Sequence, residues 1–299
     1  MEKLKIAIVG YGNIGRFTLE AVEAASDMEC VGVVRRSGSA EGIPELAPYK
    51  VVSDIAGLGK VDVAILSVPS RSVEENSLKY LSLGISTVDS FDIHGDICAL
   101  RAKLGPVAAA NGAVSVISAG WDPGSDSIVR ALMQGLAPKG ISYTNFGPGR
   151  SMGHSVAAKA VPGVKDALSV TIPIGTGLHR RMVYVELEAG ASEEAVRAAI
   201  LADPYFCHDE THVIPVPSID TLNDMGHGVN LVRKGVSGAT HNQLLEFNMK
   251  INNPALTGQV LVMAARAAAR QKPGCYTMIE IPVIDMLEGE REQLIKTLV

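Results

Sequence analysis

Two aspartates lie directly after predicted strands, at the positions where catalytic residues of an open α/β sheet are expected. Asp92 lies in "SFDIHGD" and Asp122 in "SAGWDPGSD". Ligands of such sheets bind beyond the carboxyl ends of the strands, so we expect both carboxylates at one edge of the sheet. Beside a nicotinamide, a carboxylate can hold a substrate ammonium or accept its proton while a hydride leaves the same carbon. Asp122 also precedes a predicted helix, and capping that helix is an equally good interpretation of its side chain.

A glycine-rich turn near the N-terminus predicts a dinucleotide site. The stretch "KIAIVGYGNIGRFTLEAVEAA" reads as a strand, then Gly10, Gly12 and Gly15 with the spacing G-x-G-x-x-G, then a helix. The first glycine allows the tight turn, the second lets backbone approach a pyrophosphate, and the third lets helix and strand pack closely. Free N–H groups at the helix N-terminus favour the phosphates. The expected cofactor contacts are Gly10, Gly12, Asn13, Ile14 and Gly15, with Ser67, Val68 and Pro69 of "SVPSRS" beside the nicotinamide.

Arg35 and Arg36 indicate which dinucleotide is bound. A second apolar run, "MECVGVV", ends about 20 residues after Gly15, where the ribose partner is expected. An acidic residue there would bind the ribose 2′-hydroxyl and repel a 2′-phosphate, whereas two arginines offer that phosphate charge and paired donors. The sequence therefore predicts NADP. The alternative is a pair of solvated arginines at a strand end.

The composition excludes several classes of protein. The 299 residues are enough for two domains, and 47% hydrophobic with 20% charged residues is typical of a soluble globular chain. A net charge of -5, with no basic stretch beyond Arg35–Arg36 and Arg180–Arg181, argues against nucleic-acid binding. Four separated cysteines favour a reducing cytoplasm. We expect no signal peptide, and no apolar run reaches the roughly 20 residues of a membrane span.

The pattern of elements predicts two domains. Apolar runs alternate with helical stretches over the first 120 residues, which indicates a Rossmann-type, doubly wound parallel sheet. After Trp121 the strands "SYTNFG", "ALSVTIPI", "MVYVELEA", "HVIPVP" and "GVNLVRKG" predict a second, α+β domain with a mixed or antiparallel sheet. A long alanine-rich helix from Pro254 is expected to return to the first domain. The predicted domains are 1–121 with 254–299, for the dinucleotide, and 122–253, for substrate binding and oligomerisation.

Three segments of the second domain offer ligand contacts, each with a plainer interpretation. The loop "NFGPGRSMGHS" can present the Met152 and Gly153 amides to an anion, or it is an ordinary turn. Arg180 and Arg181 can clamp a carboxylate, or they are paired charges at a sheet edge. His227 lies between glycines in "MGHGVN", which suggests a tight loop with an exposed imidazole.

The stretch "HDETH" resembles a zinc motif only superficially. His208 and His212 have the i, i+4 spacing of a zinc pair on a helix, but the glutamate is at the third position instead of the second. Prolines flank the segment on both sides. We therefore expect no metal site.

With these residues assembled, the chain resembles the meso-diaminopimelate dehydrogenases, a family of NADP-dependent amino acid dehydrogenases, over essentially its whole length. The resemblance implies reversible oxidative deamination at the D-configured carbon of meso-2,6-diaminopimelate, which gives L-2-amino-6-oxopimelate, ammonia and NADPH. In reverse, this reaction serves lysine biosynthesis. The likeness also implies a homo-oligomer. The stretches that carry it are "VGYGNIGR", "VVRR", "SVPS", "SFDIHGD", "SAGWDPGSDS", "FGPGRSMGHS" and "INNPALT".

The family pattern also assigns roles to individual residues. It implies that Arg35 and Arg36 bind the 2′-phosphate. Many members carry Trp where this chain has Phe146, and the smaller ring leaves the strictness of substrate selection open. The residues implied around the reacting D-centre are Asp92, Trp121 and Asp122, with the Met152 and Gly153 amides near its carboxylate. Those implied at the distal L-centre are Thr171, Arg181, His227 and Asn253.

Two other functions remain as alternatives. An imine reductase like dihydrodipicolinate reductase would need a basic "HH…K…SGTA" segment, which the sequence lacks. A non-catalytic NADP-sensing protein would bind the cofactor to control a partner. Such a sensor needs no aspartates aimed at the nicotinamide.

Overall fold

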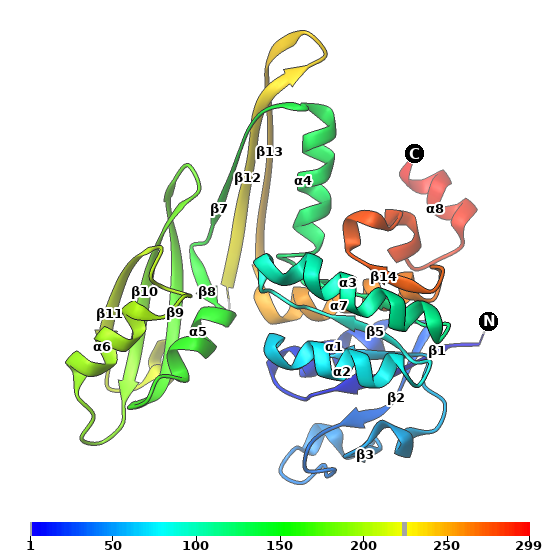
Figure 1. Cartoon of the computed structure of the whole chain (residues 1–299), viewed down its shortest axis with the longest axis horizontal. Coiled ribbons are helices and arrows are strands. Elements are labelled where there is room, and N and C mark those ends of the chain that lie inside the picture. Colours follow the sequence, from blue (N-terminus) through cyan, green and yellow to red (C-terminus); the bar gives the residue numbers. More distant parts are fainter. Residues whose placement is uncertain (1, 223–225) are drawn as a thin grey trace. The chain divides into compact units, whose positions relative to one another are not determined.

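The computed structural model describes residues 2–222 and 226–299, whose contacts divide the chain into two units (Figure 1). Unit 1 comprises Met1–Ile128 and Pro254–Val299, and unit 2 comprises Val129–Asn253. The first boundary falls inside helix α4 (Ser125–Leu136), slightly later in the chain than the change of sequence pattern after Trp121. No helix among the described residues is long and apolar enough to cross a membrane.

Unit 1 is built on a seven-stranded sheet in which all pairings are parallel, in the order β14-β6-β5-β4-β1-β2-β3. The chain moves outward from β1 in one direction and then from β4 in the other, which is the doubly wound order of a Rossmann fold. This confirms the predicted fold of the first domain. The strands are β1 (Leu4–Val9), β2 (Met28–Val34), β3 (Val51–Val52), β4 (Val63–Leu66), β5 (Ser86–Asp89), β6 (Val114–Val116) and β14 (Gly274–Tyr276).

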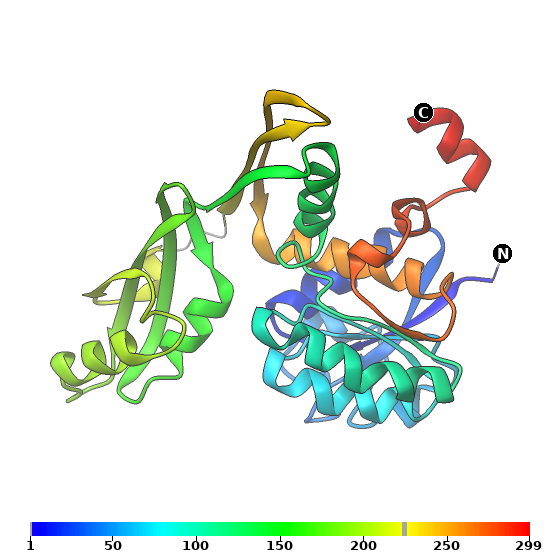
Figure 2. The ribbon, with the colours of Figure 1, turned by 45° about the horizontal axis from the view of Figure 1, so that its top comes forward.

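Helices cover both faces of this sheet (Figure 2). Side chains of β1 alternate between the two faces, as strand geometry requires. Ile6 and Ile8 pack in a core shared with α1 and α7, whereas Ala7 and Val9 pack in a second core with Tyr80 of α2. The helices are α1 (Asn13–Ala24) and α7 (Asn253–Ala268) on one face, and α2 (Val73–Leu81) and α3 (Ile97–Ala110) on the other, while α8 (Arg291–Leu298) ends the chain.

Unit 2 contains two smaller sheets. The first has the order β11-β10-β9-β8 and is mixed, because β10 pairs antiparallel with β9 and parallel with β11. The second, β13-β12-β7, is antiparallel throughout. The predicted α+β class of the second domain is confirmed. Its elements are β7 (Lys139–Phe146), β8 (Gly149–Ser151), α5 (Met152–Lys159), β9 (Val164–Gly175), β10 (Leu178–Leu187), α6 (Glu193–Ala202), β11 (Glu210–Pro215), β12 (Gly226–Ser237) and β13 (Thr240–Asn252).

Candidate active site

The central strands of unit 1 end side by side. Val9 of β1 is in register with Leu66 of β4, and Leu66 with Asp89 of β5. The segments that follow these strands therefore start at one edge of the sheet. They carry the glycine turn, Ser67 to Pro69, and Asp92, so unit 1 brings these predicted site residues to a common edge.

The glycine turn is fitted closely to the end of β4. Gly10 has a φ of +88°, and a Cβ built on it would lie 2.4 Å from the carbonyl oxygen of Ser67. A Cβ on Gly15 would lie 2.4 Å from the carbonyl oxygen of Gly10. Gly12 differs, because nothing lies within 4 Å of the corresponding position and its backbone is open to an approaching group. Turn, close packing and open approach are the three roles that a dinucleotide turn requires of its glycines.

The N-terminus of α1 suits an anion. The helix starts at Asn13, its Gly12 cap has no side chain to bond the first amides, and its first turn holds no acidic residue. The amides of Asn13 and Ile14 lie in that first turn. The Ser67 Oγ is buried and has no hydrogen-bond partner among the described residues. Together with the open position at Gly12, these features fit the pyrophosphate of a dinucleotide.

The two arginines after β2 have different surroundings. Arg35 donates from Nη1 to the Ser39 carbonyl at 2.6 Å and so braces the loop that it begins. Arg36 is exposed and makes none of the hydrogen bonds or ion pairs found among the described residues. Arg35 thus uses one guanidinium nitrogen to brace the loop, whereas no described residue bonds the Arg36 guanidinium.

Asp92 is held in place by a residue that sequence reasoning did not single out. The Ser70 hydroxyl donates to Asp92 Oδ1 at 2.6 Å, and the Asp92 N–H donates to Ser70 Oγ at 3.3 Å. Ser70 starts the short helix after β4, and Asp92 follows β5, so the two neighbouring loops are joined. The two preceding strands, β4 and β5, were expected as neighbours, and this was the sequence signal that could have placed Ser70 beside Asp92.

Asp122 lies in a tight loop between β6 and α4. A Cβ on Gly124 would lie 1.9 Å from the carbonyl oxygen of Gly120, so the loop closes on itself only with glycine there. Trp121 is 6% exposed, and its carbonyl accepts the N–H of Asp126 at 3.1 Å. The peptide from Asp122 to Pro123 is cis. Helix α4 starts at Ser125, three residues after Asp122.

In unit 2, the residues expected at the distal centre gather around β8. Gly149 pairs with Thr171 across β8 and β9. A Cβ on Gly149 would lie 2.6 Å from the Cα of His227, so these two strands touch through the glycine. Asn253 donates from Nδ2 to the Arg150 carbonyl at 3.4 Å. Thr171, His227 and Asn253, which are far apart in sequence, therefore surround one short strand.

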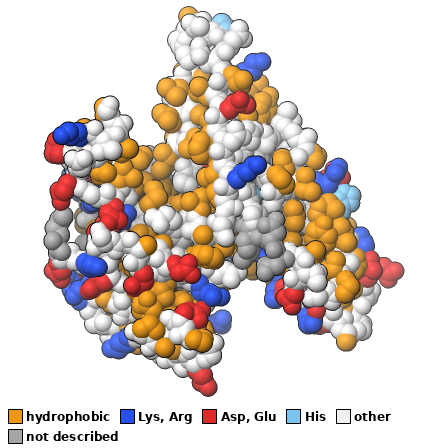
Figure 3. Space-filling view, turned by 180° about the vertical axis from the view of Figure 1, so that it is seen from behind, with side chains coloured by type: hydrophobic (Ala, Val, Ile, Leu, Met, Phe, Trp, Pro, Cys, Tyr) orange, Lys and Arg blue, Asp and Glu red, His pale blue; other side chains and the backbone are white. Residues whose placement is uncertain are grey.

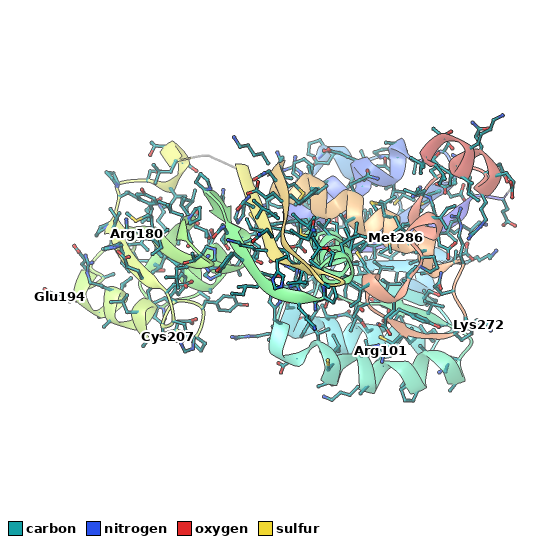
Figure 4. The ribbon with its side chains drawn as sticks, turned by 90° about the horizontal axis from the view of Figure 1, so that it is seen from above. Arg101, Arg180, Glu194, Cys207, Lys272 and Met286 are labelled. Atoms are coloured by element: carbon teal, nitrogen blue, oxygen red, sulfur yellow. The ribbon has the colours of Figure 1, made fainter. Side chains whose placement is uncertain are left out.

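Arg181 joins this group through Thr171. Its Nη1 donates to Thr171 Oγ1, and its Nε donates to an Asp209 carboxylate oxygen at 2.6 Å. The Arg181 side chain is only 11% exposed, whereas Arg180, labelled in Figure 4, is 41% exposed and pairs with Glu210 at 2.8 Å. Arg180 thus has the sheet-edge role, and Arg181 is the buried, orientated guanidinium.

The expectation that His227 lies on a tight loop with an exposed imidazole was wrong. His227 lies within β12, in register with Ile251, and is 7% exposed instead of lying on an open loop. Its Nδ1 accepts the Gly228 N–H at 2.8 Å. Gly228 is required because a Cβ there would lie 2.5 Å from the Met249 carbonyl oxygen. Gly228 therefore reflects close strand packing and not a turn.

The "HDETH" stretch supplies the partner of Arg181. Residues 210–215 form β11, so His208 and His212 do not share a helix face, and His212 contacts Glu210 at 2.8 Å. Asp209 bonds Arg181, a role that sequence reasoning missed. Among the described residues, no group of three or more His, Cys, Asp or Glu side chains is placed to hold a metal ion.

Three further predicted residues lie at the end of β7 and at the start of α5. The helix starts at Met152, so the Met152 and Gly153 amides lie in its first turn, which contains no acidic residue. Phe146 lies at the end of β7, and its ring contacts the His179 ring at a centroid distance of 5.5 Å. The backbone N–H of Phe146 donates to His179 Nε2 at 2.8 Å. The Arg130 guanidinium lies 5.9 Å from the Phe146 ring centroid. Phe146 is thus fixed by two neighbours within unit 2.

His154 is a neutral imidazole in this neighbourhood. Burial, with a smaller contribution from the Arg181 charge, lowers the pKa of His154 to about 3. Its Nδ1 lies 2.8 Å from the Ser151 hydroxyl, and the rings of Tyr205 and Phe206 meet it edge-on. The residue was visible in "GHS", but nothing in the local pattern indicated its burial.

Known proteins share this arrangement of sequence and fold. The profile described as "Diaminopimelic acid dehydrogenase C-terminal domain" matches residues 120–180. The meso-diaminopimelate D-dehydrogenase of Bacteroides fragilis is 64% identical over 299 residues, which cover 100% of both chains. The chain belongs to the meso-diaminopimelate D-dehydrogenase family. Membership confirms the resemblance found in the sequence motifs.

Solved structures extend the likeness to this family's fold. The C. glutamicum DAP dehydrogenase in complex with DAP matches with a TM-score of 0.90 and 29% identity, covering 100% of both chains. An engineered D-amino acid dehydrogenase bound to NADP+ matches with a TM-score of 0.88 and 29% identity, covering 99% of this chain and 100% of its own.

Proposed function

We propose that this chain catalyses the NADP-dependent, reversible oxidative deamination of the D-centre of meso-2,6-diaminopimelate to L-2-amino-6-oxopimelate and ammonia, a reaction of lysine biosynthesis. The observation that carries the proposal is full-length family membership, at 64% identity to a meso-diaminopimelate D-dehydrogenase. The pairing of a dinucleotide turn with aspartates at the same sheet edge supports it. An imine reductase or a cofactor sensor has no such support.

The cofactor is NADP, bound by the glycine turn and the loop after β2. The α1 N-terminus and Gly12 would hold the pyrophosphate, and Arg36 would bind the 2′-phosphate, in a loop braced by Arg35. Ser67, Val68 and Pro69 would line the nicotinamide side, since they follow β4 directly. When bound, NADP supplies the acceptor for one hydride.

Asp92 and Asp122 act on the amine of the reacting carbon. The substrate amine must be neutral for its lone pair to displace hydride, so one carboxylate takes the ammonium proton while both hold the nitrogen in place. Loss of the C–H hydrogen as hydride to the cofactor, with the nitrogen lone pair forming the C=N bond, leaves a substrate iminium, the protonated imine. Water adds to this imine, and ammonia leaves as the C–N bond breaks. The Trp121 ring, buried beside Asp122, would limit the access of bulk water.

The distal amino acid group is assigned to unit 2. Arg181 is orientated by Asp209 and Thr171, so its remaining donors are positioned for a substrate carboxylate. His227 and Asn253 would complete the binding of the L-centre, and the Met152 and Gly153 amides, with Phe146 nearby in sequence, would contact the carboxylate of the D-centre. Fixing the distal end selects which of two chemically alike centres reacts.

The test is NADP reduction followed by absorbance, with meso-diaminopimelate against the L,L and D,D isomers, and with NAD in place of NADP. Turnover that needs a D-centre and prefers the meso form and NADP supports the proposal. Tight NADP binding without turnover of any isomer would instead favour a cofactor sensor. Reduction of a cyclic imine, with no deamination, would favour the imine reductase.

A homo-oligomer in a reducing cytoplasm is also proposed. Leu132 of α4, Ile141 of β7 and Leu244 of β13 are 62%, 60% and 57% exposed, and Figure 3 shows apolar side chains among the charged ones on one face of the molecule. Burying such side chains against a second copy would be favourable. The four cysteines are all free, which supports the compartment. Light scattering coupled to gel filtration gives the oligomeric state directly.

A further inference from the structure

A buried carboxylate joins the two loops that carry the reactive aspartates. Asp89 ends β5 and is 0% exposed. Its Oδ1 accepts the N–H of Phe91 at 3.0 Å and the N–H of Ser118 at 3.0 Å. Phe91 directly precedes Asp92, and Ser118 lies in the loop that leads from β6 to Asp122. One oxygen atom therefore holds the start of both loops.

The backbone of Asp89 reinforces this junction. Its carbonyl accepts the Ala119 N–H at 2.7 Å, next to the bond that its side chain makes with Ser118. Ser118 has a φ of +55°, a left-handed conformation that costs energy for a residue with a side chain. Contacts on both sides of Asp89 thus maintain an unfavourable backbone conformation three residues before Trp121.

A buried carboxylate at position 89 lowers the stability of the fold, because it loses its hydration. Burial raises the pKa of Asp89 to about 6, and its Oδ2 is buried with no hydrogen-bond partner among the described residues. The described part of the chain supplies no salt bridge to it. The Asp89 charge acts on the Cys275 thiol, whose pKa is raised to about 12, mainly by burial. An apolar side chain would avoid the cost of desolvating the carboxylate.

We propose that Asp89 is a positioning residue of the dehydrogenase reaction, whose Oδ1 holds the loops of Asp92 and Asp122 in the one arrangement that serves the substrate amine. The inference rests on the proposed function. A misplacement of about 1 Å can cost about a hundredfold in rate, so a rigid junction behind both aspartates has a kinetic value that offsets its cost to stability.

Three variants separate positioning from charge and from general stability. Asp89→Ala removes the acceptor of both amides. Asp89→Asn keeps an Oδ1 acceptor in the same place but removes the charge. Thr87→Val is the matched control, because it removes the buried hydrogen bond between the Thr87 and Ser115 hydroxyls, on the same two strands, β5 and β6, and leaves both loop amides bonded. For each variant, kcat and KM are measured with meso-diaminopimelate, and the NADP Kd by nucleotide fluorescence.

We expect Asp89→Ala to lower kcat about a hundredfold, with an NADP Kd close to that of the wild type. Asp89→Asn should restore most of the rate, and Thr87→Val should lower Tm without lowering kcat. A kcat of Asp89→Ala equal to that of Thr87→Val would overturn the proposal. So would an Asn variant as slow as the Ala variant, because the charge and not the acceptor would then matter. If Asp89→Ala does not fold, Asp89→Ser, whose shorter side chain cannot span both amides, replaces it.

Amide hydrogen exchange gives a readout that needs no turnover. Asp89→Ala should speed exchange at Phe91 and Ser118, and Thr87→Val should not. If the wild type bound NADP but deaminated no isomer, the proposed function would fail, yet exchange would still report whether Asp89 fixes the loops. Unchanged exchange at both amides would overturn the inference in either case.

Discussion

Replacing Ser70 by alanine tests how Asp92 is held. Ser70 donates a hydrogen bond of 2.6 Å to Asp92 Oδ1, and the two residues belong to loops after neighbouring strands. A hydrogen bond to a charged group contributes about 1.5–3 kcal/mol. Both groups are partly exposed, so the lower value applies, and at about 1.4 kcal/mol per tenfold we expect kcat/KM for meso-diaminopimelate to fall about tenfold.

The cofactor and a neighbouring serine provide the controls. Ser70→Ala should leave the NADP Kd close to that of the wild type, because the hydroxyl that it removes bonds Asp92, and the glycine turn, residues 67–69 and the loop of Arg36 are unchanged. Ser72 lies in the same segment, and its hydroxyl makes no capping hydrogen bond to α2. The control variant Ser72→Ala should therefore have the kcat/KM of the wild type. Steady-state rates of NADP reduction measure all three proteins. A Ser70→Ala kcat/KM equal to that of Ser72→Ala would refute the reasoning.

Three further perturbations follow from the site. Arg36→Asp should raise the KM for NADP at least about tenfold, through loss of a charge-assisted bond, and improve use of NAD; equal losses with both cofactors would contradict the assignment. Arg181→Ala should raise the KM for meso-diaminopimelate far more than that for NADP, with Arg180→Ala near wild type, and equal effects on both substrates would argue against a distal anchor. Because the pKa of His154 is lowered from 6.5 to about 3, the unfolded chain binds up to one proton more between these two pH values, and the free energy of unfolding should fall as the pH drops through this range. The contribution is at most about 1.4 kcal/mol per pH unit; urea titrations on either side of pH 6.5 should show a smaller pH dependence in His154→Gln, and an identical one would disprove this source.

Local patterns predicted the first unit well because its strands are short, buried on both faces and separated by strong helices. The strand at residues 240–252 was missed, although "LEFNMKI" alternates apolar and polar residues, which is the pattern of a half-buried strand. Its partner β12 was expected from its apolar residues, but the glycines around His227 were taken for a turn. The close approach of Gly228 to the Met249 backbone comes from the pairing of β12 with β13, which the stretch around His227 does not reveal.

The sequence predicted those parts of the candidate site whose backbone conformation follows from a local motif, as at Gly10, Gly12 and Gly15. It did not predict the contacts between distant segments. Asp209 reaches Arg181 because β11 lies beside β10, and Ser70 reaches Asp92 because β5 lies beside β4. Neither partner carries a local signal that separates it from an ordinary surface residue.

Isotope transfer tests the central claim most directly. Two samples of meso-diaminopimelate are prepared, one deuterated only at the D-configured carbon and the other only at the L-configured carbon, and the reduced cofactor is analysed by mass spectrometry. We expect deuterium from the D-centre to appear in NADPH, with slower turnover, and deuterium from the L-centre to stay in the amino-oxo acid. Transfer from the L-centre, or reduced cofactor without deuterium from either sample, would contradict hydride removal at the D-centre.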